Sequence, residues 1–373
     1  MRVPFLDIKA QYQDLAGELD QTALDVLRSG AYVLGPHNKG LEEEVAQMHG
    51  VRHAIAVNSG TDALRILMEA AGVGPGDEVI TTAFTFVASL EAIVQIGAVP
   101  VLVDILPETF DLDPAAIEPA VTEKTKAILP IHLFGQLTDV RAIETIANRH
   151  RLTVLEDAAQ AIGSHCEGRY AGQWGRGAGL SFYVTKNLGA IGDGGMILTN
   201  DAEVDANSRS LRVHGMGRER YYYDAVGYTS RLSELQAAFL RVKLRKLDEW
   251  NAQRDRIAQV YLQQLAGVEG IHLPKLHPGN NHTWHQFTVR TSRRDELQAF
   301  LKEREIDSMI YYPVPLHLHQ PYARFSGAPG SLGVTEEVSR QVLSLPVHQH
   351  LSEAQIEHVV ASIRAFAASP AAV

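Results

Sequence analysis

The feature that most constrains the fold is an alternation of short apolar runs with longer amphipathic runs between about residues 51 and 200. Helical periodicity lies between several of the apolar runs, over Thr61–Ala71, Phe86–Ile96 and Asp139–Arg149. Strands that alternate with helices connect through right-handed crossovers, which predicts a mostly parallel sheet covered by helices on both faces. The predicted strands are Ala54–Val57, Glu78–Thr81, Val99–Val103, Ala127–Ile131, Thr153–Glu156, Leu180–Tyr183 and Met196–Leu198.

The chain changes character after residue 200. Leu232–Leu265 is almost free of helix breakers and predicts one or two long helices, and Pro274–His282 is typical of a linker. We therefore expect a large α/β domain over residues 1–250 and a smaller α+β domain over residues 251–373, on which residues 1–30 could pack. The smaller domain should contain a strand, a helix, a strand and a helix, over His285–Val289, Arg294–Glu303, Ser308–Tyr312 and Ser352–Phe366.

Charge balance and cysteine content exclude several classes of protein. The chain has 34 Lys and Arg against 44 Asp and Glu, a net charge of −10. Because binding to nucleic acid or to an anionic membrane needs a basic face, we expect neither as a partner. The single cysteine, Cys166, can form neither an internal disulfide nor a zinc site of several cysteines. The N-terminus lacks a signal-peptide pattern, and no apolar run approaches the roughly 18 residues of a membrane span, so we expect a cytoplasmic protein.

Ligands of open α/β sheets bind beyond the carboxyl ends of the strands, and three segments lie there. The first is Asn58–Leu64, where Ser59, Gly60 and Thr61 open a helix directly after a predicted strand. A helix N-terminus with a glycine that admits close approach is an anion site. Ser and Thr are also ordinary N-cap residues, so this motif alone leaves both interpretations open.

The second segment, Glu156–Gln160, places Asp157 at the end of an apolar strand. A partly desolvated carboxylate there needs a cationic partner, and the protonated ring nitrogen of pyridoxal phosphate is one such partner. A helix-capping role for Asp157 is the alternative.

The third segment, Ser181–Gly189, contains Lys186 soon after a buried strand. A lysine whose pKa is lowered by burial can act as an amine nucleophile that forms a Schiff base. The glycines that follow it lack the strand-to-helix context of a dinucleotide site and predict a tight turn. In this order, the three segments supply a phosphate cradle, a partner for the pyridine nitrogen, a hydrogen bond to the ring oxygen, and an amine.

Together these motifs resemble the DegT/DnrJ/EryC1/StrS aminotransferases, which are fold-type I pyridoxal phosphate enzymes that aminate nucleotide-linked keto sugars. The resemblance extends over nearly the whole chain. The segments that carry it are Val3–Asp7, Tyr32–Pro36, Ser59–Leu64, Gly74–Val79, Glu156–Gln160 and Thr185–Gly189.

The resemblance implies roles for individual residues in binding pyridoxal 5′-phosphate. Lys186 is the expected internal aldimine and proton-transfer base, Asp157 the partner of the ring nitrogen, and Gln160 the contact to the ring oxygen. The resemblance also implies that an aromatic residue, Phe84, stacks on the ring, although a core phenylalanine is the alternative. The residues expected at the phosphate are Gly60, Thr61 and Ser181.

The segment Gly227–Ala238 resembles the part of the family that reaches into a neighbouring active site, which implies a homodimer with shared sites. Thr229 stands where the family usually has an Asn that donates to the cofactor phosphate, and its hydroxyl can also donate one hydrogen bond. Arg231 fits the carboxylate of the amino donor or the nucleotide diphosphate, while a helix-cap salt bridge remains open.

Tyr311–His317 resembles the members that aminate a 3-keto sugar, which implies sugar or donor contacts from Tyr312 and His317. We therefore expect transfer of an amino group from L-glutamate to a dTDP- or UDP-linked 3-keto sugar. A 4-keto sugar aminotransferase and a regulatory protein on the same scaffold are the alternatives. Lys186 argues against a dehydratase, and the missing glycine fingerprint argues against a nicotinamide dehydrogenase. We expect no metal site, because the His-x-His pairs at 317–319 and 348–350 lack acidic partners.

Overall fold

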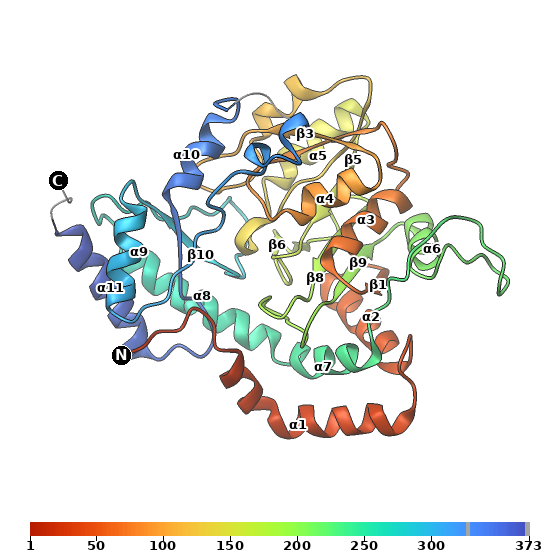
Figure 1. Cartoon of the computed structure of the whole chain (residues 1–373), viewed down its shortest axis with the longest axis horizontal. Coiled ribbons are helices and arrows are strands. Elements are labelled where there is room, and N and C mark those ends of the chain that lie inside the picture. The colour runs from red at the N-terminus through yellow and green to blue at the C-terminus, as the bar shows by residue number, and fades with distance from the viewer. Residues whose placement is uncertain (326–328, 370–373) are drawn as a thin grey trace.

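The computed structural model of the chain describes residues 1–325 and 329–369 (Figure 1). Its centre is a seven-stranded sheet in the order β1-β9-β8-β5-β4-β2-β3. Neighbouring strands from β8 to β3 run parallel, and β9 is antiparallel to both β1 and β8. This confirms the predicted fold class, a mostly parallel seven-stranded sheet. The strands are β1 (His53–Val57), β2 (Glu78–Thr82), β3 (Val99–Val103), β4 (Thr125–Ile128), β5 (Thr153–Asp157), β8 (Gly177–Ser181) and β9 (Gly195–Thr199).

The strand β8 begins and ends earlier than its predicted range, Leu180–Tyr183. Its first half is rich in glycine, a residue that carries no apolar pattern, so periodicity could not find it. A Cβ on Gly179 would lie 2.8 Å from Leu64 Cδ2, and one on Gly177 would lie 2.6 Å from Leu198 O. Glycine therefore lets neighbouring elements approach β8 closely, and the strand ends well before Lys186.

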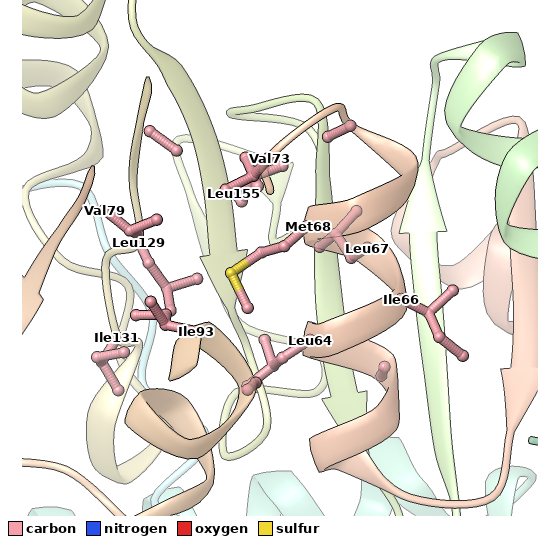
Figure 2. Packing of buried hydrophobic residues seen from close by; sticks show 14 of the residues in the cluster. Leu64, Ile66, Leu67, Met68, Val73, Val79, Ile93, Leu129, Ile131 and Leu155 are labelled. Atoms are coloured by element: carbon pink, nitrogen blue, oxygen red, sulfur yellow. The ribbon is translucent and has the colours of Figure 1, made fainter. Parts of the chain in front are cut away.

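Helix α3 (Gly60–Ala70) packs on the sheet, and its first residue, Gly60, lies beside Ser181 at the carboxyl end of β8. The Ser59 hydroxyl accepts a hydrogen bond from Asp62 N at 3.1 Å, which caps the helix at its first turn. Figure 2 shows Leu64 and Met68 on the side of α3 that faces Leu129 and Leu155 of the sheet region. Burial of this apolar face fixes the direction in which the N-terminus of α3 points.

Helices α1 (Ile8–Ser29) and α2 (Pro36–His49) precede the sheet and were not foreseen by the strand-helix pattern. In Figure 1, α1 lies alongside α7 (Glu234–Leu244) at the edge of the molecule. The two helices share a small apolar cluster that includes Leu15, Leu19 and Phe239. The other helices that pack around the sheet are α4 (Ala88–Gln95), α5 (Val140–His150) and α6 (Ala202–Leu211).

The C-terminal part of the chain forms its own apolar cluster around Tyr261, Trp284 and Phe287. The predicted strand Ser308–Tyr312 is wrong: this segment makes a single bridge, Met309 to Ser344, and β11 pairs with β10 instead. Pro313 ends the extended run. Tyr311 and Tyr312 of this segment line a cavity of the large sheet. The elements are α8 (Leu247–Gln264), β10 (Phe287–Arg290), α9 (Arg294–Glu303), α10 (Gly333–Gln341), β11 (Val342–Leu345) and α11 (Glu353–Ala367).

Val3 connects the N-terminal segment to the C-terminal part of the chain. It bridges to Ile306, with Val3 N donating to Glu305 O at 2.8 Å, and its side chain belongs to the C-terminal cluster. The division at residue 250 falls within α8, and we keep it as a proposal. A short hairpin of β6 (His165–Cys166) and β7 (Arg169–Tyr170) completes the described strands. Of the helices in the described ranges, none has the length and apolar character that crossing a membrane requires.

Candidate active site

A cavity of 740 Å³ lies at the carboxyl ends of β5 and β8. Its wall is made by the start of α3, the segments after β5 and β8, and residues 310–312. Parallel strands converge there, which is where α/β sheets place their ligands. The predicted site residues that line it are Gly60, Thr61, Asp157, Gln160, Ser181, Lys186 and Tyr312.

The start of α3 provides the anion-binding part of this cavity. Gly60 faces Ser181 so closely that a Cβ on Gly60 would lie 2.7 Å from Ser181 Cβ. Thr61 and the Ser181 hydroxyl line the same corner. The backbone N–H groups of Gly60 and Thr61 at the helix start, together with the positive end of the helix dipole, make this corner suited to a phosphate.

Asp157 ends β5 and is only 5% exposed. One carboxylate oxygen, Oδ1, accepts from Ala159 N at 3.1 Å, and Oδ2 accepts from the Ser89 hydroxyl at 2.7 Å. Burial raises the pKa of Asp157, and the hydrogen bonds from Ser89 and Ala159 and the charges of Lys186 and His132 oppose it. A cation bound beside Asp157 would favour the ionised carboxylate.

Lys186 lies in a turn after β8, where Lys186 N donates to Tyr183 O at 2.8 Å. Burial lowers the pKa of Lys186 to about 8, against the opposing charge of Asp157. Within the described part of the chain, its Nζ atom makes no hydrogen bond, and part of the side chain faces the cavity. An amine form is therefore accessible near neutral pH, as a nucleophile or proton carrier requires.

Gln160 and Tyr312 form the opposite side of the cavity. Gln160 Oε1 accepts from Phe134 N at 2.9 Å, and its Nε2 donates to the Tyr312 hydroxyl at 3.2 Å. Burial raises the pKa of Tyr312, so its hydroxyl keeps its proton. That proton remains available for donation, because the hydroxyl oxygen acts as acceptor toward Gln160.

The structure corrects the choice of aromatic residue. Phe84 is 0% exposed and belongs to the core, where it meets Phe110, Phe134 and Tyr312 at their ring edges or at a tilt. Phe86, two residues later, is 56% exposed and lines the cavity. The ring that can stack on a planar ligand is therefore Phe86.

Three predicted residues lie outside the cavity of their own chain. Thr229 is exposed, and its Oγ1 lies 3.3 Å from His214 Nε2. Arg231, two residues later in the sequence, is half-buried. His317 is buried, with Nε2 at 3.1 Å from Glu336 Oε1. The cavity thus contains no contribution from these three side chains within one chain.

Several cavity residues were missed by reasoning from the sequence: Ser89, His132, Tyr183 and His285. His132 lies shortly after β4, just as Asp157 lies at the end of β5. The rule that ligands bind beyond the carboxyl ends of strands could therefore have identified His132. Ser89 and His285 carried no such signal, because they approach from a helix and from a segment after the predicted linker. Within residues 1–325 and 329–369, no group of three or more His, Cys, Asp or Glu is placed to hold a metal ion.

The chain is similar to known proteins over almost its whole length. Residues 13–364 match the DegT/DnrJ/EryC1/StrS aminotransferase family. The chain is 49% identical over 368 residues to the Pleiotropic regulatory protein of Geobacillus stearothermophilus, covering 98% of this chain and 99% of that one. It is 46% identical over 366 residues to the dTDP-3-amino-3,4,6-trideoxy-alpha-D-glucose transaminase of Streptomyces venezuelae, covering 98% and 96%.

Two solved structures are similar along almost the entire chain. The crystal structure of S. venezuelae DesV in complex with a ketimine intermediate matches with a TM-score of 0.96 and 46% identity, covering 99% of both chains. The structure of NtdA from Bacillus subtilis with bound cofactor PMP matches with a TM-score of 0.93 and 32% identity, covering 99% of this chain and 86% of that one.

Proposed function

Because this chain belongs to the DegT/DnrJ/EryC1/StrS aminotransferase family, we propose that it moves an amino group from L-glutamate to a nucleotide-linked 3-keto sugar, using pyridoxal 5′-phosphate. The observation that carries the proposal is that one cavity contains the buried Asp157 and the amine of Lys186, which makes no hydrogen bond among the described residues. A carboxylate and an amine of this kind are what the cofactor's ring nitrogen and its carbonyl require.

The residues of the cavity fit this cofactor. Asp157 would hold the ring nitrogen, Lys186 the carbonyl carbon, and Gln160 the ring oxygen. Gly60, Thr61 and Ser181 would hold the phosphate at the start of α3, and Phe86 would cover the ring. When bound, the cofactor supplies an electron sink for the carbon that loses its proton.

Lys186 and Asp157 divide the remaining work. Nζ of Lys186, with a pKa of about 8, can take the proton from the Cα of the amino donor and deliver it elsewhere in the cavity. Asp157 keeps a positive charge on its bound partner by staying ionised. Tyr312 and Phe86 line the same space, where a bound cofactor and substrate would leave little room for water.

The proposals for the 3-keto sugar and for the nucleotide are supported by different observations. A sugar hydroxyl or carbonyl could accept the free proton of Tyr312, and the transaminase from S. venezuelae, at 46% identity, is named for a dTDP-linked 3-amino sugar. We retain both dTDP and UDP as nucleotides. The net charge of −10 implies that the positive charge facing the diphosphate is local, and Arg231 is one candidate.

We propose a homodimer with shared sites, to which Thr229 and Arg231 contribute across the interface. Neither residue lines the cavity of its own chain, and both lie in a segment that follows the loop after α6, which projects from the body in Figure 1. Apolar side chains are exposed at the cavity, in this loop and beside the start of α7, as expected of a surface that a second copy covers. They are Tyr32, Val33, Phe86, Tyr183, Ile191 and Val226. A cytoplasmic location is proposed with it, which suits the free, buried Cys166.

The test starts from the visible absorption band of the bound cofactor. Lys186→Ala should remove this band and all amino transfer, because the amine that bonds to the cofactor is gone. Lys243→Met is the matched control, because burial also lowers the pKa of Lys243 to about 8. The Nζ atom of Lys243, a residue of α7, donates to Gly189 O, which lies in the loop that carries Lys186. A Lys186→Ala protein with an unchanged band and full turnover would show that the assignment is wrong.

The same wild-type protein is then offered L-glutamate with dTDP- and UDP-linked 3-keto and 4-keto sugars. We expect amino sugar from 3-keto substrates. Product from 4-keto substrates alone would overturn the proposed regiochemistry. The regulatory protein from G. stearothermophilus makes a regulatory role the second candidate. A wild-type protein that binds the cofactor but aminates no sugar of the panel would favour that role.

A further inference from the structure

The charge of Asp157 depends on a balance in which one hydroxyl has the largest opposing effect. Burial raises the pKa of Asp157, and the hydrogen bond from Ser89 is the first influence that lowers it again. The backbone N–H of Ala159 and the charges of Lys186 and His132 follow. Tyr312, the other titratable group that interacts with Asp157, stays neutral. Removing the Ser89 hydroxyl should therefore shift the balance toward the protonated acid.

Ser89 approaches Asp157 from the first turn of α4. It is 1% exposed, and its Oγ lies 2.7 Å from Asp157 Oδ2, 3.0 Å from Thr85 Oγ1 and 3.3 Å from Phe86 O. Thr85 is buried as well. Because both hydroxyls are buried, water competes little for these hydrogen bonds, which strengthens the one to the carboxylate.

Proton counting fixes the direction of these hydrogen bonds. Ser89 has one hydroxyl proton, and an ionised Asp157 can only accept, so Ser89 donates to Asp157 and Thr85 donates to Ser89. When Asp157 takes up a proton, its own O–H can donate to Ser89 Oγ. The Ser89 proton then turns to the carbonyl oxygen of Phe86, at 3.3 Å. The alignment from Thr85 to Asp157 is thus required while Asp157 is charged, and a protonated Asp157 can also adopt the reversed arrangement.

We propose that Ser89 is a positioning residue that holds Asp157 ionised and oriented for the cofactor ring, with Thr85 orienting the Ser89 hydroxyl. The inference rests on the proposed cofactor role of Asp157. The turn over residues 85–89 then has two tasks, because it also carries Phe86, the aromatic residue proposed to cover the cofactor ring. One turn would set both the stacking of the ring and the charge at its nitrogen.

The first measurement uses protein without cofactor, in which the Asp157 carboxyl is titrated by ¹³C NMR and assigned with Asp157→Asn. Ser89→Ala should raise the pKa of Asp157, Ser89→Thr should restore it, and Thr85→Val should raise it less. Ser208→Ala is the matched control, because Ser208 is buried in α6, outside the cavity, and its Oγ has no hydrogen-bond partner among the described residues. This variant should leave the titration unchanged.

The second measurement is the dissociation constant of pyridoxal 5′-phosphate as a function of pH. Ser89→Ala should weaken binding about tenfold or more, the range for losing a hydrogen bond to a charged group, and the loss should grow as the pH falls. Ser89→Thr should bind like the wild type, which a merely structural defect would not predict.

An Asp157 titration that is the same in Ser89→Ala as in the wild type overturns the inference. If Ser89→Ala does not fold, Thr85→Val decides, because an unchanged titration there shows that the hydroxyl chain does not act on Asp157. Failure of the proposed function looks different. In that case Ser89→Ala shifts the titration, but Asp157→Asn binds the cofactor as well as the wild type does.

Discussion

At the scale of single residues, the site combines a carboxyl group and an amine whose pKa values burial moves toward each other. Burial raises the pKa of Asp157 and lowers the pKa of Lys186 to about 8. Each shift disfavours the charged form, so the protein without cofactor carries a cost in stability. A bound cationic ring would offset the cost at Asp157.

This cost leads to a prediction for Asp157→Asn in protein without cofactor. A carboxyl whose pKa is raised in the folded state binds protons more readily there than in the unfolded chain, so stability falls as the pH rises through the raised pKa. The Asn side chain carries no charge and can still accept from Ala159 N and donate to Ser89 Oγ. At neutral pH the variant should therefore melt a few degrees above the wild type, while it binds the cofactor more weakly.

Differential scanning calorimetry between pH 5 and 8 provides the measurement, with Asp25→Asn as a control, because Asp25 is exposed on α1. We expect the melting temperatures of wild type and Asp157→Asn to converge as the pH falls. A variant that melts below the wild type throughout, with the same dependence on pH, would contradict the account of a costly buried charge.

The sequence identified Asp157 and Lys186 as candidates because both lie at or soon after the end of a buried strand, where open sheets bind ligands. The family resemblance added Gln160. It misplaced the aromatic residue for a local reason. In an extended strand, the side chains of Phe84 and Phe86 would point to the same face. Here the chain turns into α4 instead, with Ser89 N donating to Phe86 O. The turn sends Phe84 into the core and Phe86 into the cavity, and no pattern of two residues could distinguish them.

At the scale of elements, helix α2 begins without a cap of its own. Its N-cap residue is Gly35, and the groups at its start donate instead to Glu234, the first residue of α7. Glu234 accepts from Gly35 N at 2.9 Å, from Asn38 Nδ2 at 2.7 Å and from His37 N. A Cβ on Gly35 would lie 2.8 Å from this carboxylate, so glycine is needed for the approach.

Removal of this shared cap should destabilise the whole protein. Burial opposes ionisation of Glu234, but the hydrogen bonds from Asn38, His37 and Gly35 hold its pKa below the ordinary value. Glu234→Gln should cost about 2–4 kcal/mol of unfolding free energy at neutral pH, because buried donors lose a charged acceptor. A depressed carboxyl pKa contributes stability above the ordinary range of Glu, and this contribution is lost as the pH falls through the depressed value.

Urea unfolding at pH 7 and at pH 4 tests this, with Glu43→Gln as the control, because Glu43 is exposed and its ion pair among the described residues is with Lys39 at 3.8 Å. The difference between wild type and Glu234→Gln should shrink at the lower pH. Equal unfolding midpoints for Glu234→Gln and Glu43→Gln at pH 7 would rule out a stabilising role for the cap.

Sequence periodicity found the sheet because buried parallel strands are short, apolar and regularly spaced. It failed where another constraint sets the sequence. The glycines of β8 serve close packing, and Ser308–Tyr312 carries tyrosines for the cavity rather than for a sheet. β11 (Val342–Leu345) was not predicted, because a four-residue run after a helix gives too little pattern to recognise.

At the scale of the whole molecule, the proposed sharing of sites between subunits predicts complementation. Lys186→Ala and Arg231→Ala should each be inactive or nearly so. In a mixed dimer with shared sites, both lesions fall in one site and the other site is intact. After the two variants are unfolded and refolded together, roughly a quarter of wild-type activity should return, since about half of the dimers are mixed.

Each variant refolded alone is the control, and the dimer is verified by analytical ultracentrifugation. If the mixture is no more active than the better single variant, then Arg231 serves its own chain. A monomeric wild-type protein would also remove the basis for this prediction.

The bridge between Val3 and Ile306 has a consequence for how the chain is made. During synthesis Val3 is translated long before its partners Glu305 and Asp307, which lie about 300 residues later in the chain. The sheet from β1 to β9 can form while the first residues are still unattached. Emergence of the segment around residues 305–307, rather than completion of the sheet, therefore sets the earliest moment at which Val3 can reach its final place.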